Sequence, residues 1–126
     1  MPHEPPFRVS ARLRSFRFAF RGMRLMLATQ HNAWIHAAFS AGVVAVGLYL
    51  RLDRWEWCAI IIAMMAVWTA EALNTALEFL CDVASPDFHP LVEKSKDIAA
   101  AAVLISALGS AVIGVLIFVP HIFGNL

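Results

Sequence analysis

Three long runs of apolar residues divide the chain, and each is close to the length needed to cross a lipid bilayer. They lie near residues 33–50, 57–81 and 98–119. A helix rises about 1.5 Å per residue, so about 20 residues cross a hydrocarbon layer of about 30 Å. Pro120 follows the third run and is expected to end its helix. The pattern predicts an all-α integral membrane protein with three transmembrane helices.

The segment before these runs, residues 10–29, interleaves arginines with apolar residues. A helical period of about 100° per residue places Arg14, Arg17, Arg21 and Arg24 on one side, beside Phe16, Phe20, Met23 and Leu27. We therefore predict an amphipathic helix on the membrane surface, with its arginines toward lipid phosphates or a bound anion. Whether Arg14 and Arg21 also hold a nucleotide stays open. The interleaved apolar residues argue against a nucleic-acid arm, and no nucleic-acid partner is expected.

The composition supports a single membrane domain. Of the 126 residues, 60% are hydrophobic and 15% are charged, which is too apolar for one small soluble core. We expect the domain to cover residues 10–121, between a disordered tail at 1–9 and a short tail at 122–126. Cys58 and Cys81 would lie at opposite ends of one span, about 34 Å apart, so they are not expected to form a disulfide.

The basic residues predict the orientation of the chain. Arg51 and Arg54 occupy the first connection between spans, whereas Lys94 and Lys96 share a side with the basic N-terminal segment. Short loops rich in Lys and Arg remain in the cytoplasm. The N-terminus is therefore expected to be cytoplasmic and the C-terminus to lie outside.

A polar stripe runs along the second span where its apolar run should be finishing. Glu71, Asn74, Glu78 and Asp82 fall within an arc of about 80° on a helix. A carboxylate within a membrane is costly unless it is paired, binds an ion or exchanges a proton, so it marks a candidate functional site. The alternative is that these groups only fasten helices together through hydrogen bonds.

The connection to the third span adds basic residues at the same depth. It places Lys94, Lys96 and Asp97 near the level of Asp82 and Glu78. Carboxylates, an amide and cations are what Mg²⁺-assisted phosphoryl transfer requires. The chain has no GxxxxGK[ST] or GxGxxG motif, so a kinase of this kind would not use the common phosphate-binding loops.

The stretches "EALNTALEFLCD", "SPDFHPL" and "KSKDIAAAAVL", at this spacing, resemble the small prokaryotic membrane lipid kinases of the diacylglycerol kinase and undecaprenol kinase family. The resemblance covers about residues 10–120, and "SPDFHPL" is closer to the undecaprenol kinase branch. It implies a homotrimer in the bacterial inner membrane. It also implies that ATP, with Mg²⁺, phosphorylates the hydroxyl of a membrane lipid, either undecaprenol or diacylglycerol, at the cytoplasmic interface.

The resemblance also implies roles for individual residues. Glu71 would be the general base, with Asn74 orienting it or the phosphates, and Glu78 would bind the metal. The nucleotide contacts would be Lys96, Asp97, His89 and Arg14, with Arg12 as the alternative to Arg14.

One position departs from the family pattern. A glutamate that helps to bind the metal in diacylglycerol kinases is replaced by Gln30, whose amide oxygen brings no charge. Either Glu78 does more of the work alone, or His31 and Asn32 reshape the site. Two other functions remain open, namely a small proton-coupled transporter and a kinase relative that has lost activity. The sequence does not decide which lipid is the substrate.

Overall fold

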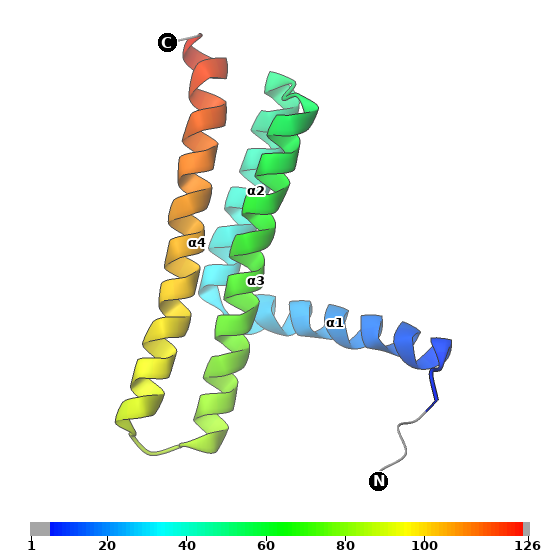
Figure 1. Ribbon diagram of the computed structural model, residues 1–126, viewed down its shortest axis with the longest axis vertical. Coiled ribbons are helices and arrows are strands. Elements are labelled where there is room, and N and C mark those ends of the chain that lie inside the picture. Colours follow the sequence, from blue (N-terminus) through cyan, green and yellow to red (C-terminus); the bar gives the residue numbers. More distant parts are fainter. Residues whose placement is uncertain (1–5, 125–126) are drawn as a thin grey trace.

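The computed structural model describes residues 6–124, which form four α-helices with short connections (Figure 1). Their bounds are Val9–Thr29 for α1, His31–Leu50 for α2, Arg54–Ala84 for α3 and Pro90–Phe123 for α4. The tails predicted at 1–9 and 122–126 lie partly outside the described residues. The described parts include helical residues, because α1 begins at Val9 and α4 ends at Phe123.

Helices α2, α3 and α4 are each long and apolar enough to cross a membrane. Large apolar side chains such as Ile105 and Leu116 are exposed along them, and α4 has no buried residue. Surfaces this apolar are stable against lipid or another protein rather than against water. The prediction of an all-α membrane protein with three helices of spanning length is confirmed.

The three long helices differ in length. α2 has 20 residues, whereas α3 has 31 and α4 has 34. At about 1.5 Å per residue, α2 matches the hydrocarbon layer, and α3 and α4 exceed it by about 15–20 Å. The excess lies at the end where α3 connects to α4, which projects past the level at which α1 joins α2 (Figure 1). The second half of the polar stripe belongs to this projecting end.

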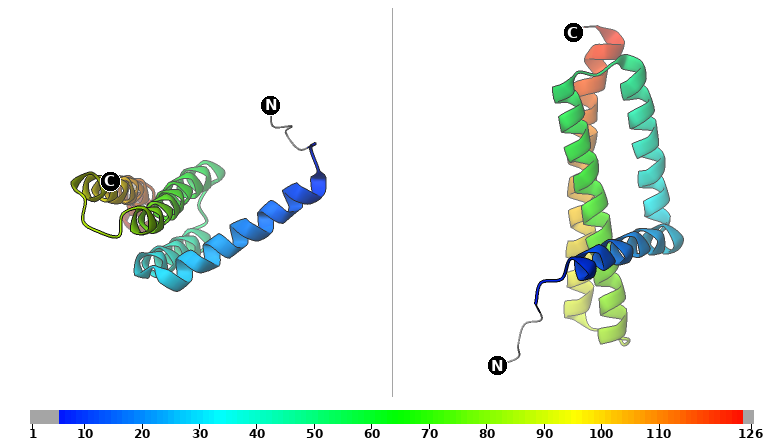
Figure 2. Two further views of the ribbon diagram at one scale, coloured as in Figure 1. Left: turned by 90° about the horizontal axis from the view of Figure 1, so that it is seen from below. Right: turned by 90° about the vertical axis from the view of Figure 1, so that its right-hand side faces the viewer.

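Helix α1 leaves the bundle sideways rather than running along it (Figure 2). The bend occurs at Gln30, an extended residue that ends α1 and precedes α2. The indole nitrogen of Trp34 donates to the carbonyl of Leu27 at 2.8 Å across this bend, and Met26 is buried beside it. The direction of α1 is thus fixed by specific contacts at its C-terminal end.

The turn between α2 and α3 is tightly closed. Arg51 adopts a left-handed conformation with φ 55°, and the N–H groups of Arg51 and Leu52 donate to the carbonyls of Leu48 and Gly47. This pair of hydrogen bonds is the Schellman arrangement that ends many helices. A Cβ at Gly47 would lie 2.9 Å from the Trp57 ring, so only glycine fits there.

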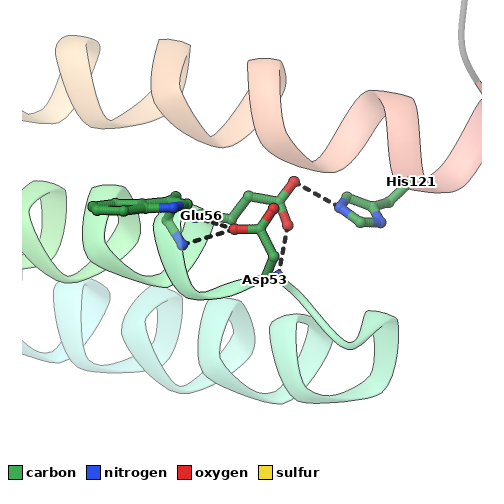
Figure 3. Close-up of polar contacts among 4 residues, drawn as sticks. Asp53, Glu56 and His121 are labelled. Carbon is green, nitrogen blue, oxygen red and sulfur yellow. Dashed lines mark hydrogen bonds and ion pairs between the residues drawn. The ribbon is translucent and has the colours of Figure 1, made fainter.

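A polar clasp, made by Asp53, Glu56 and His121, joins the start of α3 to the end of α4 (Figure 3). The Asp53 carboxylate accepts from the backbone N–H of Trp55 and Glu56, and the Glu56 carboxylate accepts from the Asp53 N–H, which forms a capping box. The second oxygen of Glu56 lies 2.8 Å from Nε2 of His121.

The prediction that Pro120 ends the last helix is wrong, because α4 continues through it to Phe123. A proline removes one backbone hydrogen bond from a helix, and this is tolerated most easily near an end. The contact between His121 and Glu56 holds the final turn against α3.

Few polar contacts hold the helices together within the apolar bundle. Ser110 on α4 donates to the Ala63 carbonyl of α3 at 3.0 Å, and the Trp68 indole of α3 donates to the Ser40 hydroxyl of α2 at 3.0 Å. α3 packs more extensively against α4 than against α2. Cys58 and Cys81 are both free, as the sequence predicts.

Candidate active site

Three polar side chains are buried together on α3, namely Glu71, Asn74 and Thr75. Glu71 is 1% exposed and is the largest fully buried side chain of the described residues. Asn74 lies almost one turn further along the helix, and its amide donates to Oε1 of Glu78 at 3.4 Å. The structure thus brings Glu71, Asn74 and Glu78 to one side of α3, as the helical spacing predicts.

Several of these buried atoms have no partner within the described part of the chain. Oε2 of Glu71, Oδ1 of Asn74 and Oγ1 of Thr75 are buried without a hydrogen bond. A buried polar atom left unpaired costs free energy, commonly about 1–3 kcal/mol. Oxygens buried at this cost are expected where a substrate, an ion or a water molecule completes the hydrogen bonding.

A pocket of about 270 Å³ adjoins these atoms. It lies among α2, α3 and α4, and Glu71, Asn74 and Asn32 contribute its polar side chains together with His36. Asn74 also lines a larger apolar groove of about 720 Å³ between α3 and α4. The candidate base therefore stands next to apolar space that suits a long hydrocarbon chain.

His36 of α2 faces Glu71 across this pocket, with its Nε2 3.5 Å from Oε2 of Glu71. Sequence reasoning uses His36 only to place the start of the first span near the interface, and its position opposite Glu71 was missed. The available signal is that an ionisable residue inside an apolar run marks a functional candidate. The register between α2 and α3, which decides its partner, is not visible in the sequence.

The projecting end of α3 and α4 holds a second polar group. Nζ of Lys96 donates to Oδ1 of Asp82 at 2.7 Å, so the predicted approach of this lysine to the end of the stripe is observed. Lys96 precedes the apolar run of α4 and therefore lies outside its membrane-spanning part. The hydrogen bond with Asp82 raises the pKa of the Lys96 ammonium above its ordinary value. Asp97 is exposed next to Lys96.

His89 caps the N-terminus of α4. It precedes α4, and its Nδ1 accepts from the backbone N–H of Leu91 at 3.1 Å, which caps the helix. Nε2 is left for another partner, because the exposed ring uses only one nitrogen in the cap. A nucleotide contact by His89 would therefore come from Nε2.

The predicted arginine contacts are not brought to the polar stripe within one chain. Arg14 and Arg21 are exposed on α1. No arginine forms an ion pair among the side chains of residues 6–124. Helix α1, which carries both arginines, leaves the bundle sideways (Figure 2).

The residues present partly fit a magnesium ion. No group of three His, Cys, Asp or Glu side chains that could hold a metal occurs in the described part of the chain. Glu78 still offers a carboxylate, and the uncharged oxygen of Gln30 is at the bend between α1 and α2. Mg²⁺ commonly takes only one or two carboxylates and completes its shell with waters and substrate phosphates. By donor type, the oxygens of Glu78 and Gln30 suit such a shared site.

Comparison with known proteins decides the family. The profile described as "Prokaryotic diacylglycerol kinase" matches residues 17–118. The chain belongs to this family. It is 37% identical to the undecaprenol kinase of Bacillus subtilis over 109 residues, which cover 86% of this chain and 89% of that protein.

Other members of the prokaryotic diacylglycerol kinase family are also similar. The diacylglycerol kinase of Escherichia coli K12 is 30% identical over 82% of this chain and 85% of its own length. That of Synechocystis is 33% identical over 84% of this chain, which spans 61% of the longer relative. Every candidate site residue except Arg14 and its alternative Arg12 lies within the family match, which begins at residue 17.

Proposed function

We propose that this protein phosphorylates a membrane lipid, transferring the γ-phosphoryl group of ATP to the lipid hydroxyl. The observation that carries this proposal is the buried Glu71 carboxylate, with Oε2 unpaired beside a pocket in a chain of the prokaryotic diacylglycerol kinase family. A carboxylate within reach of a hydroxyl is suited to accept its proton. Glu71 would thus be the base in this reaction.

In the proposed reaction, the hydroxyl oxygen of the lipid attacks the γ-phosphorus while its proton passes to a carboxylate oxygen of Glu71. The bond between the γ-phosphorus and the bridging oxygen breaks, and ADP leaves. Asn74, whose Oδ1 is unpaired, orients the hydroxyl or the phosphates next to Glu71. Catalysis in phosphoryl transfer comes mainly from such positioning and from charge stabilisation.

The phosphates of ATP are proposed to lie at the projecting end of α3 and α4. Lys96 supplies a cation there and is held by Asp82, while Asp97 and Nε2 of His89 remain available to the nucleotide. Glu78 and Gln30 would hold Mg²⁺ together with the phosphates. The ion would supply charge neutralisation for the phosphates.

We further propose that α1 lies on the cytoplasmic surface of the bacterial inner membrane. Its sideways direction and the level at which it joins α2 support this placement (Figure 2). The N-terminus would then be cytoplasmic, which also puts the basic residues of α1 on the cytoplasmic side. Protease or thiol-reagent access to each end in sealed vesicles tests the orientation, and access to the N-terminus only from outside the cell would contradict it.

The assembly is proposed to be a homotrimer. α4 exposes small and apolar residues along its length, which favours close packing with other helices in a membrane. Arg14 and Arg21 lack an acidic partner among residues 6–124, so a neighbouring subunit's phosphate site is where they would act. Chemical cross-linking in the membrane tests this assembly, and a pattern that stops at dimers contradicts it.

Undecaprenol is the substrate that we favour, with diacylglycerol as the second candidate. The match to the undecaprenol kinase of Bacillus subtilis, at 37% identity, covers nearly the whole of both chains. The pocket itself discriminates weakly, because an apolar lining accepts long tails of different kinds.

The deciding experiment measures initial rates with Mg-ATP in mixed micelles, offering undecaprenol and diacylglycerol side by side. We expect lipid-dependent phosphate transfer, faster with undecaprenol. Faster transfer to diacylglycerol would overturn the choice of lipid but not the kinase activity. Transfer to neither lipid would overturn the proposal and favour an inactive relative, or a proton-coupled transporter if pH-driven uptake is found in vesicles.

A further inference from the structure

The contact between His36 and Glu71 is the one polar approach between α2 and the buried carboxylate. Nε2 of His36 lies 3.5 Å from Oε2 of Glu71, with the side chains 16% and 1% exposed. The atoms are close, but their alignment does not form a hydrogen bond. Catalytic hydrogen bonds are often long without substrate and shorten when it binds. A small rotation of either side chain would make this one.

The surroundings leave His36 as the only ionisable group facing Glu71 among the residues that line their pocket. From α2 and α3 the other polar groups are the amides of Asn32 and Asn74. From α4 only apolar residues contribute, namely Ala100, Val103, Leu104 and Ala107. The imidazole of His36 is thus the one aromatic N–H donor beside Glu71 in this pocket.

The orientation of the imidazole is set by its neighbours on α2 and α3. The ring of Trp68 meets it edge-on, with ring centroids 6.3 Å apart and an interplanar angle of 63°. Trp68 is itself fixed, because its indole N–H donates to the hydroxyl of Ser40. A chain of contacts from Ser40 through Trp68 therefore directs His36 toward Glu71.

We propose that His36 is a positioning residue for the Glu71 base, an inference that rests on the proposed lipid kinase function. Its Nε2–H donates to one carboxylate oxygen of Glu71 and so directs the other oxygen toward the lipid hydroxyl. His36 thus affects turnover through Glu71 and does not itself touch the reacting atoms.

The competing explanation is that His36 only fastens α2 to α3. A contact that only holds the helices together changes stability, whereas a positioning contact changes kcat at nearly unchanged KM. Two substitutions separate these roles: His36→Phe removes the donor and keeps a ring, and His36→Gln keeps a donor that does not titrate. Ser110→Ala is the matched control, because it removes one interhelical hydrogen bond that involves neither Glu71 nor His36.

The experiment measures kcat, KM for both substrates and thermal stability for the parent and the three variants, in mixed micelles with the preferred lipid. We expect His36→Phe to lower kcat by about 10-fold or more at nearly unchanged KM, since small misplacements of a reacting group are costly. His36→Gln should recover most of the rate. Ser110→Ala should leave kcat unchanged.

The change in kcat at constant KM is the decisive readout. A parental kcat in His36→Phe overturns the inference, and so does a loss of kcat in Ser110→Ala as large as that in His36→Phe. If His36→Phe does not assemble, His36→Leu, which also removes the donor, takes its place. Failure of the proposed function is distinguishable, because the parent itself would then transfer no phosphate.

Discussion

The start and the middle of α3 each carry a glutamate that faces a histidine, but the hydrogen bonding of the two glutamates differs. At the start, the Glu56 carboxylate uses both oxygens, one toward the Asp53 N–H and the other toward His121. In the middle, Glu71 faces His36 in the same chemical pairing, yet Oε2 of Glu71 has no hydrogen bond among the described residues. The first pair is also partly exposed, whereas Glu71 is buried.

This difference is what we expect between a pair that stabilises the fold and a pair that belongs to an active site. A fold is more stable when its polar groups are hydrogen-bonded. The clasp of Asp53, Glu56 and His121 satisfies its polar groups in this way where the start of α3 meets the end of α4 (Figure 3). A buried carboxylate oxygen without a hydrogen bond lowers the stability of the fold. Such a loss of stability is typical of sites that bind a partner from outside the chain. Pairing of the same residue types therefore says little until the geometry around each is known.

The strongest test of this comparison replaces the glutamate of each pair, Glu71 and Glu56, by glutamine. Glu71→Gln should lower kcat by at least about 100-fold, since general base catalysis contributes about 10²–10⁴-fold. Its thermal stability should be retained, because no hydrogen bond of Oε2 is lost. Glu56→Gln should keep the parental kcat. Near-parental activity in Glu71→Gln would refute the role of Glu71 as base. An inactive Glu56→Gln variant that assembles normally would refute the purely structural role of Glu56.

A second prediction compares two lysines at the projecting end. Lys96→Met should raise KM for ATP by about 10-fold or more, because it removes a charge-assisted contact to phosphate. Lys94→Met is the control, since Lys94 is exposed two residues away, on the other side of α4, and forms no ion pair in the described part of the chain. Equal effects of the two variants on KM for ATP, measured at fixed free Mg²⁺, would show only a general attraction of ATP to positive charge.

A third prediction concerns a carboxylate introduced at Gln30, the bend between α1 and α2. Gln30→Glu should lower the Mg²⁺ concentration needed for half-maximal rate by about 3- to 10-fold, because a carboxylate binds a hard cation more strongly than an amide. Gln30→Ala should raise that concentration. If neither variant changes the Mg²⁺ requirement, Gln30 is not a ligand and Glu78 holds the metal without it.

The sequence predicted the helices better than their contacts. The three spanning helices follow from apolar runs, and the alignment of Glu71, Asn74 and Glu78 follows from the helical period alone. The approach of Lys96 to Asp82 also followed, because a short connection returns the chain to the same level. These features depend on local pattern and on the thickness of a bilayer.

The missed features depend on how the helices are placed against one another. His36 and Glu71 lie on different helices, and a rotation of α2 would separate them without any change in its apolar pattern. Pro120 was expected to end α4, but the helix continues to Phe123, and its last turn is held by the contact of His121 with Glu56 on α3. Such contacts between residues far apart in sequence need the folded structure.

The smallest predicted effect concerns the clasp at the start of α3. A double-mutant cycle with Glu56→Gln, His121→Gln and the pair should give a coupling free energy of about 0.5–1 kcal/mol, since the two side chains are about a quarter to a third exposed. The cycle is measured by reversible unfolding in mixed micelles, with kcat as the second readout. A structural pair leaves kcat unchanged in all three variants. Loss of turnover in His121→Gln, without loss of stability, would mean that the pair of Glu56 and His121 also takes part in function. The distinction drawn between this pair and the pair of Glu71 and His36 would then be wrong.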